Sequence, residues 1–289
     1  MATAKRTQIF MRFPEGRDRA LTLSYDDGVE QDARLMDILD ENGIKATFNL
    51  NSGRYAPEGK VYEVGTIHRP FSESAATELY SNPNHEVAVH SLTHPHLEAM
   101  SPATVAYEII KDRENLEAQF GIIVRGMAYP YGTLNDTVVE VLKSCGIAYA
   151  RTVVSTKKFT LPTDWLRMPA TCHHKAPELM ELAESFITKK VSRNDPLLFY
   201  LWGHSYEFEA DNNWNVIEEF AAYMGNRDNV WYATNIEIYE YIEAYKRLVF
   251  SVDGSIVHNP TSVDLWCSLG KPDEAAIKLP AGETIYLEV

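Results

Sequence analysis

The stretch Ala20-Leu21-Thr22-Leu23-Ser24-Tyr25-Asp26-Asp27-Gly28 decides the fold that we expect for this chain. Its first six residues are typical of a buried strand, and Gly28 allows the sharp turn that ends the strand. If strand alternation breaks down at that turn, Asp26 and Asp27 can face one cavity, one binding a metal ion and the other free as a general base. Taken alone, the pair is more typical of a strand end capped by an Asx turn.

A second polar motif, His90-Ser91-Leu92-Thr93-His94, follows another strand-like run at residues 86–89. Histidines four residues apart in a helical turn lie on one face, close enough to share an ion. Such pairs also occur by chance, but here both polar motifs come directly after a strand. One carboxylate, two imidazoles and a spare carboxylate are what a hydrolytic metal site with open coordination positions requires.

Two further strand ends carry candidate catalytic groups. In Tyr129-Pro130-Tyr131-Gly132, proline rigidity can hold the backbone N–H of Tyr131 toward a developing oxyanion, although an ordinary turn is the alternative. In Leu201-Trp202-Gly203-His204, the histidine follows a buried strand, where it suits a general acid near neutral pH or a satisfied core position equally well.

The remaining histidines are weaker candidates. Adjacent side chains in an extended segment point to opposite faces, so at most one of His173 and His174 is expected to join the same site. We place these two and His68 in a substrate groove.

The apolar pattern alternates between the periods of strands and helices along most of the chain. Strands are predicted at 20–25, 45–50, 86–89, 122–129, 147–154, 196–202 and 230–233, and helices at 32–42, 74–80, 101–120, 135–145, 177–189, 215–224 and 236–247. About seven alternations predict a parallel α/β architecture. A barrel is favoured over an open sheet because no GxGxxG motif follows a strand and the candidate residues lie at several strand ends.

The texture of the sequence changes near residue 248. Short apolar runs broken by Asp253-Gly254, Asn259-Pro260 and Ala281-Gly282 predict three or four antiparallel strands. We therefore expect a barrel domain at 1–247 and a small β appendage packed on it at 248–289. The appendage could contact carbohydrate or act as a lid, but we favour a structural or dimerising role.

Composition excludes several classes of partner. The 289 residues carry a formal charge of −14, which repels the phosphates of nucleic acids and anionic membranes. Cys145, Cys172 and Cys267 form no CxxC pair, so neither a disulfide framework nor a cysteine zinc site is indicated. Residues 1–12 lack the apolar core of a signal peptide and no apolar run approaches the length of a membrane span, so we expect a cytoplasmic protein.

Taken together, these motifs resemble those of the polysaccharide deacetylases with the NodB homology domain, carbohydrate esterase family 4. The family's Thr-Phe-Asp-Asp-Gly motif corresponds to residues 24–28, and its His-Ser/Thr-x-x-His motif is fully matched at 90–94. Its Leu-x-x-His motif corresponds to 201–204, and Asp164-Trp165 is the nearest match to its fourth motif. The resemblance spans about residues 20–245 and implies an irregular (β/α)7 barrel.

The resemblance also implies a role for each matched position. Asp26 would be the general base, Asp27, His90 and His94 the metal ligands, Tyr131 the oxyanion donor through its backbone N–H, and His204 the general acid. The implied cofactor is one divalent metal ion, zinc by preference, with cobalt, nickel and manganese also suited to these ligands. The implied substrate is an acetylated oligosaccharide or polysaccharide that loses an N-acetyl or O-acetyl group.

One position departs from the family. The arginine of the Arg-x-Pro-Tyr motif, which orients the catalytic aspartate in the family, falls at Ala128. Arg125, Arg151 and Arg167 are the candidate replacements, and we favour Arg167 because it lies close to Asp164.

Two alternative functions stay open from the sequence. The chain could hydrolyse small non-sugar amides, as some barrels of this superfamily do, or it could be a degenerate homologue that only binds glycans. Aromatic residues could stack on sugar rings or simply fill the core; the candidates for stacking are Tyr25, Tyr129, Trp165 and Trp202. A homo-oligomer is neither indicated nor excluded.

Overall fold

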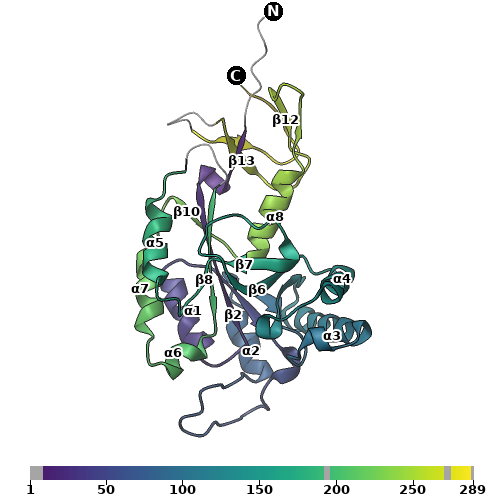
Figure 1. Cartoon of the computed structure of the whole chain (residues 1–289), viewed down its shortest axis with the longest axis vertical. Helices are drawn as coiled ribbons and strands as arrows, with labels where there is room; N and C mark the ends of the chain where they lie inside the picture. The colour runs from purple at the N-terminus through teal and green to yellow at the C-terminus, as the bar shows by residue number, and fades with distance from the viewer. Residues whose placement is uncertain (1–8, 192–195, 270–274, 288–289) are drawn as a thin grey trace, which may run out of the picture.

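The computed structural model describes residues 9–191, 196–269 and 275–287, and a parallel sheet forms its centre (Figure 1). The sheet strands pair in the order β7-β6-β5-β4-β3-β2-β9-β8, all parallel to their neighbours. Their bounds are β2 (Arg19–Asp26), β3 (Ala46–Leu50), β4 (Glu86–Val89), β5 (Gly126–Ala128), β6 (Tyr149–Ser155), β7 (Met168–Ala170), β8 (Cys172–His173) and β9 (Leu197–Gly203).

One extended segment closes the sheet into a barrel. Strands β7 and β8 follow each other within residues 168–173, yet β7 pairs with β6 and β8 pairs with β9. Between them, the N–H of Thr171 donates to the carbonyl oxygen of Tyr200 at 2.8 Å. This segment therefore acts as a single barrel strand that joins both edges, and the seven-stranded (β/α) barrel expected from the sequence is confirmed. The register shift between Arg151 and Ser155 on β6 makes the barrel irregular.

Helices surround the barrel, and most of them begin and end where the sequence predicts. They are α1 (Asp32–Glu41), α2 (Glu73–Tyr80), α3 (Pro102–Phe120), α4 (Asp136–Ser144), α5 (Leu179–Thr188), α6 (Tyr206–Ala210), α7 (Asn215–Met224) and α8 (Asn235–Lys246). For α3, the Ser101 side chain accepts the N–H of Thr104, Pro102 takes the first helical position, and Gly121 ends the helix with a φ of 66°.

Three elements differ from the prediction. The closing segment β7–β8 and the short helix α6 were not expected. The predicted strand at 230–233 exists as β10 (Val230–Tyr232), but it pairs only with the first residues of β2, Arg19 to Leu21. It is therefore an addition at the amino-terminal end of the barrel rather than one of the strands that close it.

Two small antiparallel sheets lie at the amino-terminal end of the barrel strands (Figure 1). One contains β1 (Phe10–Arg12), β13 (Leu265–Ser268) and β14 (Ile277–Leu279), and the other contains β11 (Val249–Phe250), β12 (Ile256–His258) and β15 (Thr284–Tyr286). The expected appendage thus exists with five strands rather than three or four, and β1 from the other end of the chain joins it. Asp26 ends β2 at the opposite end of the barrel, away from the strands of the appendage that the structure describes.

Among the described residues, no helix is both long enough and apolar enough to cross a membrane. The division of the chain at residue 247 stays a prediction.

Candidate metal centre and its surroundings

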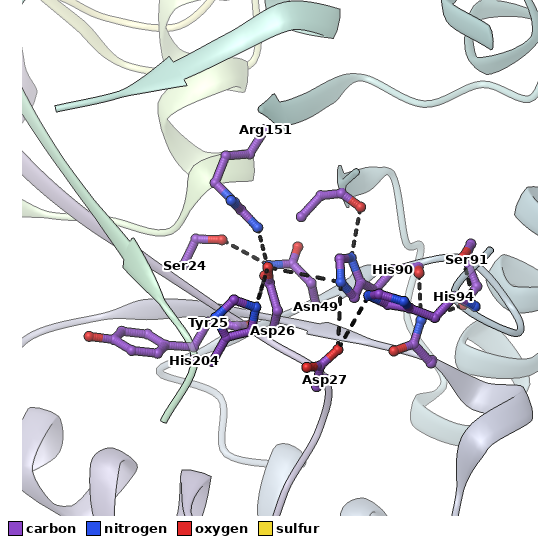
Figure 2. Close-up of polar contacts among 12 residues, drawn as sticks. Ser24, Tyr25, Asp26, Asp27, Asn49, His90, Ser91, His94, Arg151 and His204 are labelled. Atoms are coloured by element: carbon purple, nitrogen blue, oxygen red, sulfur yellow. Dashed lines mark hydrogen bonds and ion pairs between the residues drawn. The ribbon is translucent and has the colours of Figure 1, made fainter. Parts of the chain in front are cut away.

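Asp27, His90 and His94 converge at the carboxyl ends of β2 and β4 (Figure 2). Asp27 Oδ1 lies 3.7 Å from His90 Nε2 and 3.6 Å from His94 Nε2, and all three candidate ligand atoms lie within 4.8 Å of one another. Bonds of about 2.0–2.2 Å from each atom to one central ion are compatible with these separations. The structure thus brings together the three residues that the sequence singles out as ligands.

Left-handed backbone conformations turn the side chains into the site. Asp27 has a φ of 81°, and Ser91 and His94 have φ values of 64° and 59°. These values are costly for residues with a side chain and tend to occur at functional sites. At Asp27 the turn breaks the strand alternation as expected, and both neighbouring carboxylates therefore approach His90, Asp26 Oδ2 at 3.9 Å and Asp27 Oδ1 at 3.7 Å.

The buried ring of His90 is oriented as a metal ligand requires. Its Nδ1 lies 2.8 Å from the carbonyl oxygen of Ala128, which can only accept, so Nδ1 carries the proton and Nε2 has a free lone pair. His90 is 1% exposed, and within the described part of the chain Nε2 has no hydrogen-bond partner. A buried acceptor without a donor, facing a carboxylate, fits a bound cation.

Electrostatics favour the same ligand states. Burial and the neighbouring imidazole of His90 lower the pKa of His94 to about 4, so the His94 imidazole is neutral at physiological pH. Burial alone would raise the pKa of Asp27, but His68 and the three histidines His90, His204 and His94 lower it below its usual range. Neutral imidazoles and an ionised carboxylate are the forms that bind metal.

Asp26 lies beside this cluster and is held by partners on two other strands, β3 and β6 (Figure 2). Its Oδ2 forms an ion pair with the guanidinium of Arg151, and its Oδ1 accepts from Asn49 Nδ2 at 2.9 Å. Asp26 is 2% exposed and Arg151 1%. Burial would raise the pKa of Asp26, but the charges of Arg151 and His90 lower it, so the carboxylate stays ionised.

Arg151 corrects our expectation about the missing arginine. It lies on β6 directly opposite Ala128 on β5, and its guanidinium packs 4.3 Å above the ring of Trp202. Arg167 instead pairs with Asp164 and Asp136, and Arg167 and Asp164 are both solvent-exposed to a considerable extent. The preference for Arg167 was therefore wrong, because proximity in sequence to Asp164 did not bring it near Asp26.

His204 follows β9 and faces Asp26 from the other side. Its Nε2 lies 3.8 Å from Asp26 Oδ2, and its Nδ1 lies 3.4 Å from Glu207 Oε2 on α6. Burial would lower the pKa of His204, but Glu207 and Asp26 raise it above its usual value. Glu207 is thus the carboxylate beside His204, whereas Asp164, the sequence-based candidate for a supporting carboxylate, lies elsewhere.

Glu207 also contacts three consecutive residues at the end of β8 and just after it. His173 Nε2 and His174 Nε2 each lie 3.2 Å from its Oε2, and Lys175 Nζ lies 3.1 Å from its Oε1. Both histidines reach one carboxylate because β8 ends at His173, and neither belongs to the cluster of Asp27, His90 and His94. The backbone N–H of Lys175 donates to His173 Nδ1 at 3.1 Å, so His173 Nε2 carries a proton and donates to Glu207 rather than binding a cation.

The position of His174 depends on a glycine. A Cβ on Gly203 would lie 2.1 Å from His174 Nδ1, much closer than any tolerated contact. The ring of His174 in turn stacks on buried Tyr25, with 5.8 Å between ring centroids.

Tyr131 borders the open side of the metal cluster. Its backbone has a φ of 57° inside a short 3-10 turn, and its ring is 56% exposed. The ring lies edge-on to His94 with centroids 4.5 Å apart and stacks on His96 at 4.0 Å. The oxyanion role of its N–H stays a prediction.

The four aromatic residues expected to stack on sugars have other partners. Tyr25 and Tyr129 are buried, and the Tyr129 hydroxyl donates to the carbonyl oxygen of Leu166 at 2.7 Å. Trp165 donates its indole N–H to Glu243 on α8 at 2.6 Å. Trp202 is buried under the guanidinium of Arg151. These contacts favour packing for the buried Tyr25, Tyr129 and Trp202, and a substrate role for the half-buried Trp165 stays a prediction.

Comparison with known proteins relates part of this chain to polysaccharide deacetylases. The family model for polysaccharide deacetylases matches residues 14–150. The peptidoglycan-N-acetylglucosamine deacetylase PgdA of Listeria monocytogenes is 26% identical over 125 residues, which cover 43% of this chain and 24% of that protein. An uncharacterized protein of Streptomyces coelicolor is 26% identical over 130 residues, covering 45% of this chain and 46% of its own. The matched region therefore spans less than half the length of these curated relatives.

A solved structure supports the fold over a longer range. A Mycobacterium smegmatis protein described as a polysaccharide deacetylase superposes with a TM-score of 0.57 at 17% identity. The superposition covers 84% of this chain and 96% of that one, so the shared architecture extends well beyond the residues matched by the family model.

Proposed function

We propose that this chain, which is related to the polysaccharide deacetylases through residues 14–150, is a metal-dependent hydrolase that removes acetyl groups from a carbohydrate. One observation carries the proposal. The ligand atoms of Asp27, His90 and His94 lie within 4.8 Å of one another, and within the described residues the buried Nε2 of His90 has no hydrogen-bond partner. Asp26 and His204 face the same space. A cation site, a base and an acid thus lie within reach of one reacting group.

Zinc is the ion that we propose, because two imidazoles and one carboxylate with open positions form a common catalytic zinc site. Cobalt, nickel and manganese would suit the same ligands. Such an ion makes water more acidic and polarises a carbonyl oxygen when it is bound.

Asp26 is the proposed general base. Arg151 and Asn49 fix its two oxygens, and the guanidinium keeps it ionised and ready to take a proton from the attacking water. The missing arginine at Ala128 was the feature that favoured a degenerate, glycan-binding homologue. With Arg151 beside Asp26, that alternative loses its support.

His204 is the proposed general acid. In its protonated form His204 directs the Nδ1 proton toward Glu207. Its second proton is on Nε2, on the side of Asp26, and this is the proton for the departing nitrogen or oxygen. The N–H of Tyr131 is the proposed donor to the oxyanion that forms when water adds to the acetyl carbonyl.

Acetate release tests this function directly. Protein stripped of metal and then reloaded with zinc or cobalt would be given N-acetylglucosamine oligomers, including peptidoglycan fragments, and acetylated xylan. We expect metal-dependent release that falls about 10²–10⁴-fold in Asp26→Asn and in His204→Ala. Arg167→Gln, altered on the surface, serves as the control. Metal binding without release from any glycan would favour a small amide substrate, and the absence of metal binding would refute the proposal.

A further inference from the structure

The loop between the 3-10 turn at Ser52–Arg54 and α2 brings a third histidine, His68, to the metal cluster of Asp27, His90 and His94. His68 Nε2 lies 3.4 Å from Asp27 Oδ2, whereas the other carboxylate oxygen, Oδ1, faces His90 and His94. The Asp27 carboxylate therefore faces the two candidate ligand histidines with one oxygen and His68 with the other.

We propose that His68 is a positioning residue that holds the ligand carboxylate of Asp27 from outside the metal cluster. This inference rests on the proposed metal-dependent function. Ligating carboxylates are commonly hydrogen-bonded through their second oxygen, and loss of such a partner typically weakens metal binding about 10–100-fold. A donor on Oδ2 restricts rotation of the Asp27 side chain and keeps Oδ1 turned toward the two imidazoles.

The geometry favours an outer partner over a fourth ligand. The set of ligand atoms that lie within 4.8 Å of one another contains Asp27, His90 and His94, and among the described residues it does not extend to His68. The side chain of His68 is 37% exposed, against 14% for His94, so it lies nearer the mouth of the site.

The loop that carries His68 is anchored on both sides of this residue. The carbonyl oxygen of Ile67 accepts from Gln31 Nε2 at 2.6 Å, and Arg69 pairs with Glu30 and Glu209 at 2.7 Å each. The His68 ring also meets the edge of Tyr206, with 5.1 Å between centroids. His68 therefore reaches Asp27 as part of a docked loop rather than as a free surface side chain.

Docking of the loop and binding of metal are coupled if His68 acts in this way. A loop that orders a ligand must itself be stabilised by the ion to the same extent, because coupling free energies are reciprocal. The backbone bonds that tie the loop down, from Glu30 N–H to Arg69 O at 2.8 Å and from Phe71 N–H to Gly28 O at 3.1 Å, report on this docking.

Metal affinity of the full chain tests the proposal. Zinc would be titrated calorimetrically into metal-stripped protein with a competing chelator, and the cobalt absorption spectrum would report the ligand environment. We expect His68→Ala to bind about 10–100-fold more weakly than wild type. His68→Gln, whose amide can still donate to Oδ2, should recover most of the affinity. His96→Ala removes another exposed histidine near the site, one paired with Glu98, and should bind like wild type.

Amide exchange at Glu30 and Phe71 provides the second measurement. We expect metal to slow this exchange in wild type and much less in His68→Ala. Equal metal affinity in His68→Ala and wild type would overturn the inference and leave the proposed function intact. Failure of the wild type to bind metal would instead refute the proposed function itself.

Discussion

Arg151 lies directly opposite Ala128 in the register of β5 and β6, and from there its guanidinium reaches the buried carboxylate of Asp26. The family's arginine position is occupied by alanine, and the adjacent strand supplies the charge. The side chain therefore approaches Asp26 from a different strand while it serves the same carboxylate.

Removing the Arg151 guanidinium should reduce activity, and an arginine at position 128 should restore part of it. In Arg151→Ala, Asp26 loses its charge partner and its orientation, and we expect kcat to fall about 10²-fold. Removing one partner of a buried ion pair also destabilises the fold, by about 3–5 kcal/mol. The double variant Ala128→Arg/Arg151→Ala should regain part of both losses, because the new side chain can occupy the vacated space. Steady-state kinetics and urea unfolding measure the two effects.

Arg167→Ala is the matched control for that experiment, since the guanidinium of Arg167 pairs with the exposed carboxylates of Asp164 and Asp136. It should leave kcat unchanged. A loss in Arg167→Ala equal to that in Arg151→Ala would contradict the assignment.

Glu207→Gln should weaken the general acid without affecting metal binding. Burial lowers the pKa of His204 and the Glu207 carboxylate raises it, so the pKa of His204 should fall when that negative charge is removed. A general acid must be protonated, and the basic limb of the pH–kcat profile should therefore move to lower pH. Zinc affinity measured in parallel should match the wild type. An unmoved basic limb would show that Glu207 does not act on His204.

Gly203→Ala tests the surroundings of His204 through the ring of His174, without removing any polar group. The new Cβ would lie 2.1 Å from His174 Nδ1 and must displace that ring from Glu207. Overpacking of this kind costs about 1–3 kcal/mol, and we expect a lower urea midpoint together with a reduced kcat at unchanged zinc affinity. Wild-type kcat in a folded Gly203→Ala protein would mean that His174 has no influence on the reaction.

Glu86 should make stability depend on pH. Burial raises the pKa of its carboxyl group to about 7 although Tyr149, Thr47 and the N–H of Ile236 donate to it. Between pH 4.5, its ordinary pKa, and pH 7, the folded protein binds more protons than the unfolded chain, so the free energy of unfolding falls as pH rises. The contribution is at most about 3 kcal/mol.

Comparison of wild type with Glu86→Gln isolates this effect, because all other titrating groups are common to both proteins. The difference in unfolding free energy between the two should change across pH 5 to 8 in the stated direction when urea unfolding is followed in metal-free protein. A difference that stays constant with pH would refute the raised pKa.

The elements of the barrel could be predicted because they depend on local signals. Apolar runs marked the strands, and the cap at Ser101-Pro102 with the stop at Gly121 marked α3. The closing segment 168–173 carried only a weak signal, since Met168, Ala170 and Cys172 alternate along it but Pro169 interrupts so short a run. Its two halves are extended because different neighbours pair with them, and this is information from the tertiary structure.

The candidate site likewise contains residues that local motifs identify and residues that only the tertiary structure identifies. Asp27, His90 and His94 stand in compact motifs, whereas Arg151 could be ranked above Arg167 only once the register of β5 and β6 was known. Glu207 was a missed local signal, because a carboxylate three residues after His204 at the start of a short helix lies within reach of its ring.

The segment that closes the barrel also sets an order of assembly. The proposed metal ligands all come from the first 94 residues, so a nascent chain carries them long before the barrel can close. The proton donor differs, because Glu207 and the residues that hold it unite only when β8 lies against β9. The proposed ligands therefore precede the closing segment in the chain, whereas the surroundings of the proposed proton donor are complete only when β8 and β9 are paired.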